Sequence, residues 1–580
     1  MVDNQARTPF RLVDDHHFVP SPKNEEDGLP DELLGILAEV GERWAAKSAP
    51  LVTQNHQRKI QEHPEWVFLL LWETVNHYNK SDDQTGYYMR LYLFGEILFS
   101  LRCELEHGRP WSKDLVDRIQ QEIARYVLVP EYHRAMHTDF IQILQRSGLP
   151  IIEELKEANL KVSAFDNRFG SDVTAFPTGS FMKGLRRSGD GDVFNSARFL
   201  TQQMAMQPME TQIEILSFLA ADEDPGTLEV LTLMLLHPET RIRRLTAELL
   251  RDLVDLKRMS GQMFKRLILL RNWLPYAEQV VLDRLIRQAR IAQIGCAPLP
   301  QGKLLNCFAS ALDGSGEQAI WLSLESEGEW LGCRLIVSQD QGLIEVDTRA
   351  FSHPEALRKE LAMVAEGVVL FAVDPAFLDT AMAHYMAVGL KSGALPPRET
   401  LQLAEWLGRS EWAPQTISEG RMLEAILAVA DKRYLEPRNQ RRILKVSANA
   451  RLRQFTEGWF LQGEDVEICL LRHLGGPGRW AANEGRALHL ICSELLEPER
   501  ESWLNRVAWT ALWLRAASYS ESDLWQYFAV IAACLKSGKP VHEIPLLQCV
   551  AERTLLTINA QIRQYAARGK AMVVGMCPGN

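Results

Sequence analysis

The stretch from His237 to Leu253 constrains the fold more than any other part of the chain. It is typical of the second helix of a two-helix unit. Pro238 suits the first turn of a helix, because the N–H that proline lacks would have no partner there. Its apolar residues recur at helical spacing: Ile242, Leu245, Leu249, Leu250 and Leu253. A shorter, more apolar helix is expected over residues 227–236. Two such helices cannot bury their apolar faces alone, so further helices must pack on them.

The pattern resembles the HEAT-repeat family, whose second helix carries a proline, an aliphatic-arginine pair, and small and leucine positions at helical spacing. Those places are held here by Pro238, Ile242-Arg243, Ala247 and Leu250. A weaker repeat begins at Pro275, 37 residues after Pro238, just below the roughly 40–47 residues of such repeats. The resemblance covers about residues 195–293. It implies an α-solenoid whose surface binds a protein partner.

Length and pattern together predict a mainly α chain with a small inserted antiparallel α/β unit. A chain of 580 residues exceeds a single core, and 46% hydrophobic with 24% charged residues is ordinary for globular proteins. Strands are expected over 304–312, 319–324, 330–337 and 342–346, with helices covering one face. The expected parts are a flexible tail (1–30), an N-terminal helical domain (31–160), a linker (161–194), HEAT-like helical repeats (195–293), a small α/β domain (300–395) and a C-terminal helical domain (396–580).

Charge and composition exclude several classes of protein. The formal net charge of −11 argues against a protein devoted to wrapping nucleic acid. The nine cysteines form no C-x-x-C, which favours reduced thiols over a disulfide framework or a zinc ribbon. The longest apolar run, Val67 to Trp72, is much shorter than the roughly 20 residues of a membrane span. With no signal peptide in residues 1–31, we expect a cytoplasmic protein without membrane association.

Two motifs suggest a metal site and a phosphate-binding loop. Partly exposed helix histidines and a tight hairpin turn account for them better. His133 and His137 lie one helical turn apart, as metal ligands do, but Arg134 stands where a metalloprotease motif needs glutamate. The turn Asp313-Gly314-Ser315-Gly316 resembles a phosphate cradle, yet strand residues follow it where a phosphate loop would open a helix. We therefore predict no bound metal and no cofactor.

Two clusters of basic residues are the strongest charge features. Residues 432–453 contain eight Lys and Arg against only Glu436, and a second set lies on the repeat helices. Such clusters neutralise phosphates or receive acidic segments, and they are also typical of solvated helix faces. No aromatic residues interleave as in a stacking platform for single-stranded nucleic acid. The candidate binding residues are Arg241, Arg243, Arg244, Arg438, Arg441, Arg442 and Lys445.

The leading hypothesis is a non-enzymatic scaffold or adaptor that binds a macromolecular partner, as the resemblance to HEAT repeats implies. One alternative is an enzyme with a site near the sheet at 304–346. Its polar candidates are Asp313, Glu317, Arg334 and Asp347. Another alternative is nucleic-acid binding through residues 432–453, which the negative net charge disfavours. A protein partner is therefore expected.

Overall fold

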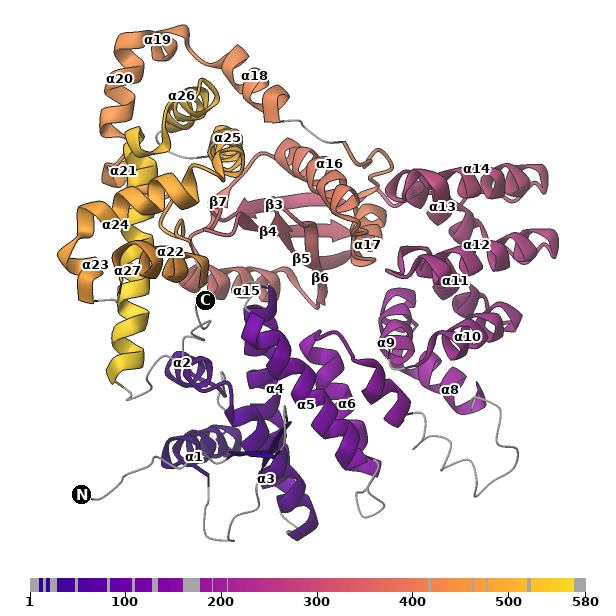
Figure 1. Ribbon diagram of the computed structural model, residues 1–580. Helices are drawn as coiled ribbons and strands as arrows, with labels where there is room; N and C mark the ends of the chain where they lie inside the picture. Colours follow the sequence, from indigo (N-terminus) through magenta and orange to yellow (C-terminus); the bar gives the residue numbers. More distant parts are fainter. Residues whose placement is uncertain are drawn as a thin grey trace, which may run out of the picture. The chain divides into compact units, whose positions relative to one another are not determined.

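Two units make up the chain in this computed structural model, one of residues 1–179 and 200–212 and the other of residues 180–199 and 213–580. Figure 1 shows their helices and strands. The structure describes residues 10–13, 17–20, 29–46, 51–80, 84–106, 110–127, 134–159, 178–189, 191–205, 207–415, 419–461, 464–475, 478–518 and 523–567.

Helix α4 (Gln84–Glu106) is the centre of the first unit. The helices that pack against it are α1 (Asp31–Ala45), α2 (Gln54–Glu62), α3 (Trp66–Lys80), α5 (Pro110–Val127) and α6 (Arg134–Ser147). The packing is apolar: Phe94 and Ile97 of α4 are fully buried. Phe94 meets Phe140 of α6 edge to face, with ring centroids 5.4 Å apart. The unit therefore has its own core.

Within residues 1–30, where a flexible tail is expected, the described residues include a short hairpin. Strands β1 (Phe10–Val13) and β2 (His17–Pro20) pair antiparallel. The other residues of this segment up to position 28 lie outside the described residues.

The expected linker, residues 161–194, contains a helix. Helix α8 (Thr178–Gly189) occupies its second half, and α9 (Val193–Ala205) and α10 (Met209–Ala221) follow. Helix α8 forms although its three glycines lower helix propensity, because tertiary packing overrides propensity: Leu185 is buried. Residues 160–177 lie outside the described residues.

Four helices of the second unit, α11 (Pro225–Leu233), α12 (Thr240–Asp255), α13 (Gly261–Leu270) and α14 (Tyr276–Ile291), form a helical stack. Helix α11 packs against α13, and α12 packs against α14, so the helices alternate between two rows. Side-chain caps start two of them. The Asp224 carboxylate accepts from the N–H of Thr227 at 2.9 Å, and Ser260 Oγ accepts from the N–H of Met263 at 3.1 Å.

The buried face of α12 differs from the expected one by a few positions. Three expected residues are buried: Ile242, Leu250 and Leu253. Leu245 and Leu249, which recur at the same helical spacing, are only half-buried. Thr246 and Ala247 are buried instead, because small side chains let the neighbouring helices approach closely.

A five-stranded antiparallel sheet follows the helical stack. Its strands are β3 (Lys303–Ala309), β4 (Glu317–Ser326), β5 (Glu329–Ser338), β6 (Gly342–Phe351) and β7 (Phe371–Ala372), in the order β6-β5-β4-β3-β7. The expected strands coincide with β3 to β6. The sequence does not indicate β7, because two residues carry no alternating pattern.

Helices pack on both faces of this sheet, where the sequence predicted cover on one face only. Helices α16 (Pro375–Ser392) and α17 (Glu399–Leu407) contact β6 and lie on one side in Figure 1. On the other side, Leu357 of α15 (Pro354–Gly367) lies against Gly332 of β5. A Cβ at position 332 would come within 3.1 Å of Leu357, so glycine permits this close approach.

The C-terminal part of the second unit is helical. Its helices are α18 (Glu419–Val429), α19 (Lys432–Leu435), α20 (Pro437–Val446), α21 (Ala450–Arg453), α22 (Glu464–Leu474), α23 (Gly478–Ala482), α24 (Glu484–Leu490), α25 (Arg500–Ala516), α26 (Leu524–Lys536) and α27 (Pro545–Ala567). The fold is mainly α with a small inserted antiparallel sheet, as expected. In the described part of the chain, no helix has both the length and the apolar character to cross a membrane.

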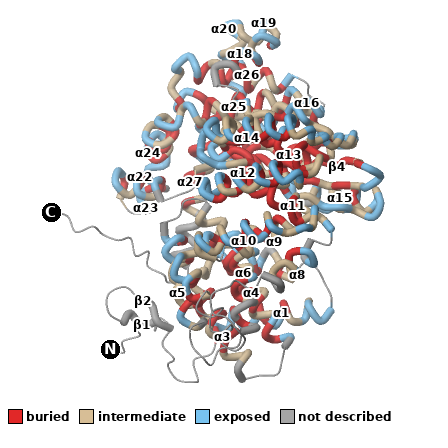
Figure 2. Tube along the Cα trace, turned by 90° about the vertical axis from the view of Figure 1, so that its right-hand side faces the viewer, coloured by how far each residue is buried: buried red, intermediate tan, exposed pale blue. Residues whose placement is uncertain are grey.

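Buried tryptophans join the C-terminal helices to the sheet unit. Trp509 of α25 donates its indole N–H to Gln318 Oε1 at 2.9 Å, and Trp459 donates to the carbonyl of Leu312 at 3.1 Å. Both indoles are fully buried, so each donor needs a partner inside the protein. The sheet and the C-terminal helices therefore share a core, and Figure 2 shows buried segments continuing between them.

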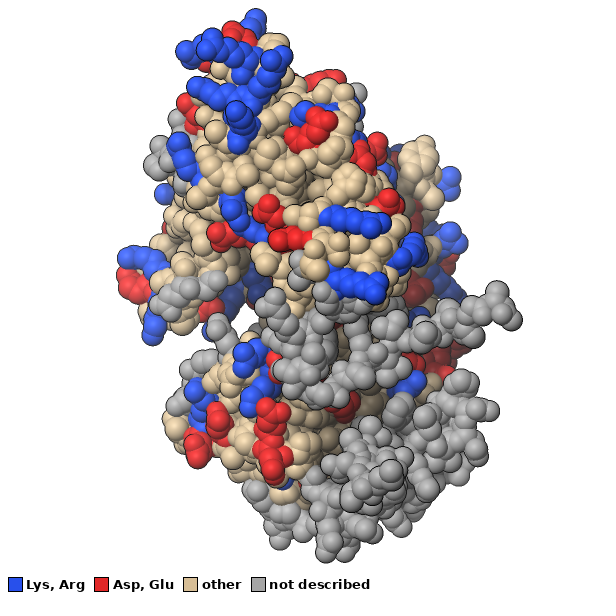
Figure 3. All heavy atoms as spheres, turned by 60° about the vertical axis from the view of Figure 1, so that its left-hand side comes forward, with Lys and Arg blue, Asp and Glu red and all other residues tan. Residues whose placement is uncertain are grey.

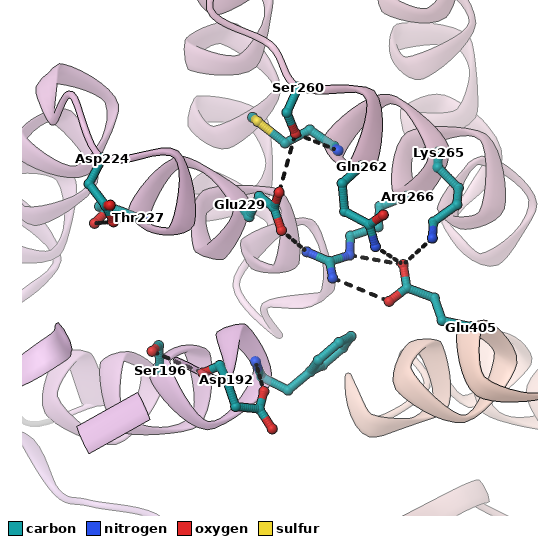
Figure 4. A network of polar contacts seen from close by, with 12 residues as sticks. Asp192, Ser196, Asp224, Thr227, Glu229, Ser260, Gln262, Lys265, Arg266 and Glu405 are labelled. Carbon is teal, nitrogen blue, oxygen red and sulfur yellow. Dashed lines mark hydrogen bonds and ion pairs between the residues drawn. The ribbon is translucent and has the colours of Figure 1, made fainter. Parts of the chain in front are cut away.

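A buried ion network connects α11 and α13 of the helical stack to α17 (Figure 4). Arg266 donates to both oxygens of Glu405, at 3.0 and 3.2 Å, and to Glu229 at 3.2 Å. Gln262 donates to Glu405 at 3.0 Å, and Lys265 Nζ lies 3.7 Å from the same oxygen. Arg266, Lys265 and Glu405 are only 4%, 5% and 6% exposed. Two cations and two carboxylates balance each other inside the protein.

Glu405→Ala should destabilise the second unit by about 3–5 kcal/mol, because Arg266 and Lys265 lose the carboxylate that they share. Urea unfolding followed by tryptophan fluorescence measures the change. Glu345→Ala is the matched control: Glu345 pairs with Arg334 at 2.6 Å where both side chains are exposed. That variant should lose less than about 1 kcal/mol. Equal losses in the two variants would contradict a stabilising role for the network.

His237, in the turn before α12, is buried in its neutral form. Its Nδ1 accepts a hydrogen bond from the N–H of Glu239 at 3.1 Å, which only the unprotonated nitrogen can do. Burial lowers the pKa of His237 to about 4, and the nearby guanidinium groups of Arg398 and Arg243 contribute to the shift. Protonation is therefore disfavoured in the folded state.

Stability should fall as the pH drops from about 6.5 to about 4, because the unfolded chain binds a proton that folded His237 does not. Between about pH 7.5 and about pH 5 this residue should account for a loss of about 2 kcal/mol. His237→Asn keeps an acceptor and removes the titration. Urea unfolding at both pH values should show that much less loss for the variant, and an identical pH dependence would refute the assignment.

Candidate functional site

Helix α20 presents the most cationic exposed surface among the candidate residues. Pro437 occupies its first turn, and only Ile443 of the helix is buried. Arg438, Arg441, Arg442 and Lys445 are exposed. Their spacing of i, i+3, i+4 and i+7 places them in one row along the helix, opposite Ile443. We call these four residues the cationic stripe.

The buried side of α20 fixes the helix to its neighbours. Ile443 packs with Val530 and Cys534 of α26 in a small apolar cluster. Directly after the helix, Ser447 Oγ accepts a buried hydrogen bond from the N–H of Leu546 at 3.1 Å. These contacts fix α20 to α26 and α27, so the cationic stripe lies on a helix that is packed against its neighbours.

Among the described residues, the cations of the stripe have no acidic partners. No carboxylate of the described residues lies within 4.0 Å of any of the four. Arg433 of α19, by contrast, pairs with Asp431 at 2.5 Å, and this carboxylate raises the pKa of its guanidinium. Figure 3 shows Lys and Arg side chains gathered where Figure 1 places α19 and α20. The stripe is therefore a concentrated patch of positive charge on the surface of the second unit.

The candidates on α12 separate into two kinds. Arg241 and Arg244 are exposed, as expected of a binding surface. Arg243 is buried, and its assignment as a binding residue is wrong. It donates to both oxygens of Glu278 at 2.7 Å and to the carbonyl of His237 at 2.8 Å. Glu278 belongs to α14, so Arg243 joins α12 to α14, two helices of the same row.

The structure brings the four polar residues of the enzyme alternative together only as two separate pairs: Arg334 lies opposite Asp347 across β5 and β6, and Asp313 and Glu317 share a turn. Asp313 Oδ1 accepts from the N–H groups of Ser315 and Glu317, at 2.9 and 2.8 Å, and so closes its own turn. Glu317 pairs with Ser338, four residues along β5 from Arg334, or roughly 13 Å in a strand. Arg334 is engaged with Glu345 at 2.6 Å. The four polar candidates do not form one site.

The metal hypothesis lies mostly outside the described residues. His133 and the side chain of His137 are not among them. Within the residues that the structure describes, no group of three or more His, Cys, Asp and Glu could hold a metal ion.

Two features of the site were missed at the level of sequence. Glu278 is the partner of Arg243 across 35 residues, and only the helix packing brings the two together. Val446, which is 37% exposed, lies one turn after Arg442 and borders the cationic stripe with an apolar side chain. The position of Val446 at the end of an amphipathic helix is the sequence feature that could have indicated it.

Because the stripe residues are exposed and unpaired, reversing their charge should not unfold the protein. Arg441→Glu combined with Arg442→Glu should change the free energy of unfolding by no more than about 0.5 kcal/mol. Ile443→Asp, which buries a carboxylate, should cost several kcal/mol. Chemical unfolding of both variants makes the comparison. Similar losses would mean that the arginines serve the fold.

Two segments of the chain match family models. Residues 208–293 are similar to the family described as the Y4lR second domain, and residues 420–559 to the Y4lR C-terminal helical domain. No match was found among the curated proteins or among the solved structures. The first segment contains the helical stack and the second contains the cationic stripe, so both candidate surfaces lie within the two Y4lR-like regions.

Proposed function

We propose that this chain is a non-enzymatic scaffold or adaptor that binds a macromolecular partner through the cationic stripe of α20. The observation that carries the proposal is the row of four exposed cations without a carboxylate partner. A row of unpaired like charges repels itself, and a partner of opposite charge relieves that repulsion.

Other helices of the same protein handle exposed cations differently. Arg118 of α5 pairs with Asp114, and Arg58 of α2 lies 3.9 Å from Glu62, each one helical turn apart. Such i,i+4 pairs are the usual arrangement on a solvated helix face. The absence of matching acids on α20 supports a binding role for its exposed side.

The helical stack supports a protein as the partner. Its helices alternate between two rows, and its sequence resembles HEAT repeats, which generally provide binding surfaces. Arg241 and Arg244 expose further positive charge there. We propose the stack as a secondary surface, because the four cations of the stripe are all exposed, regularly spaced and without a carboxylate partner among the described residues.

Affinity purification from the native cells, with quantitative mass spectrometry, tests this function. Wild type should recover a protein partner in near-stoichiometric amount, and Arg441→Glu with Arg442→Glu should reduce the recovery about tenfold or more. Arg358→Glu with Lys359→Glu is the matched control, since these neighbours are exposed on α15. It should behave like wild type.

Equal recovery by all three proteins would contradict binding through α20. Stoichiometric nucleic acid in place of a protein would contradict the scaffold and favour nucleic-acid recognition.

A further inference from the structure

We infer that the partner presents an amphipathic helix with a row of carboxylates, which docks lengthwise along the cationic stripe. The inference rests on the proposed function and names the chemistry of its partner.

The spacing of the stripe favours a helical partner over an extended one. Positions i to i+7 of a helix span roughly 10 Å along its axis. Glutamates with the same spacing on a facing helix repeat with the same rise, so each cation can meet a carboxylate. In an extended peptide, side chains of one face recur every ~6.6 Å, so about two of them would fall on the stripe.

The chemistry of the stripe suits carboxylates. Three of its four residues are arginines: Arg438, Arg441 and Arg442. The guanidinium group binds a carboxylate through two parallel hydrogen bonds, which fixes direction as well as charge. Because Ile443 holds the helix from behind, the three guanidinium groups extend from a fixed backbone.

An apolar edge accompanies the charge. Val446 is 37% exposed and lies beside Arg442 on the helix surface. Exposed ion pairs alone bind weakly, so a partner helix gains affinity by placing an apolar residue against this edge. The expected partner helix is therefore acidic along one row and apolar beside it.

The surroundings disfavour nucleic acid on the same surface. The nearest aromatic side chain of α19, Tyr434, is engaged, because its hydroxyl donates to Asp523 at 3.2 Å and its ring packs against Tyr527. No base-stacking platform results from these residues. The formal net charge of −11 also opposes the binding of a polyanion such as nucleic acid.

Fluorescence anisotropy of the full chain with three labelled probes tests the inference at about 0.15 M salt. The first is a helical peptide of about 20 residues with glutamates at i, i+3, i+4 and i+7 and leucines beside them. The second has the same composition with the glutamates spread around the helix. The third is an oligothymidine of equal length.

The row peptide should bind about tenfold more tightly than the spread peptide and than the oligothymidine. Arg441→Glu with Arg442→Glu should weaken its binding about tenfold or more. Arg358→Glu with Lys359→Glu should bind it like wild type.

Equal affinity for the two peptides, or tighter binding of the oligothymidine, would overturn the inference. The proposed function survives such a result if the charge reversal on α20 still removes the partner from affinity purification. The proposed function fails, whatever the peptide result, if the charge-reversed variant recovers as much partner as wild type.

Discussion

The shared carboxylate of Glu405 is the contact on which the second unit depends. It accepts from Arg266 and Gln262 at 3.0 Å, and 139 residues separate it from Arg266 along the chain. Burying two cations is unfavourable unless carboxylates surround them, and Glu229 completes the balance. This network fixes the helical stack against α17, and α17 contacts strands β4 and β6 of the sheet. The sheet in turn joins the tryptophan-rich C-terminal core through the hydrogen bond from Trp509 to Gln318.

Much of the fold could be predicted because its signals are local. The helix after Pro238 and the strands β3 to β6 follow from periodicity within a few residues, and turns with glycine separate the strands. Elements that depend on distant contacts were missed: β7 has two residues and exists through its pairing with β3. Helix α8 forms despite its glycines, because Leu185 is buried. Periodicity also failed to distinguish Leu249 from Leu250, since it locates a face to within one residue.

In the candidate site, too, the features that depend on local sequence could be predicted, and those that depend on distant contacts could not. The cationic stripe was predictable because its four members lie within eight positions of one helix, and helix geometry alone places them in a row. Arg243 and Arg244 are both arginines, and the sequence does not indicate which of the two pairs with a carboxylate. In the structure Arg243 donates to Glu278. An arginine on a helix of this stack is a surface group or an interhelical bridge depending on one carboxylate of a packed helix. That the stripe has no carboxylate partner among the described residues likewise follows from the three-dimensional structure and not from the sequence.

Amide hydrogen exchange of the full chain, with and without its purified partner, tests the central claim most directly, because it compares the two candidate surfaces in one experiment. The account predicts slower exchange in α20 on binding, with α12 and α14 unchanged. Protection of α12 or α14 with α20 unchanged would contradict it and would make the helical stack the binding surface.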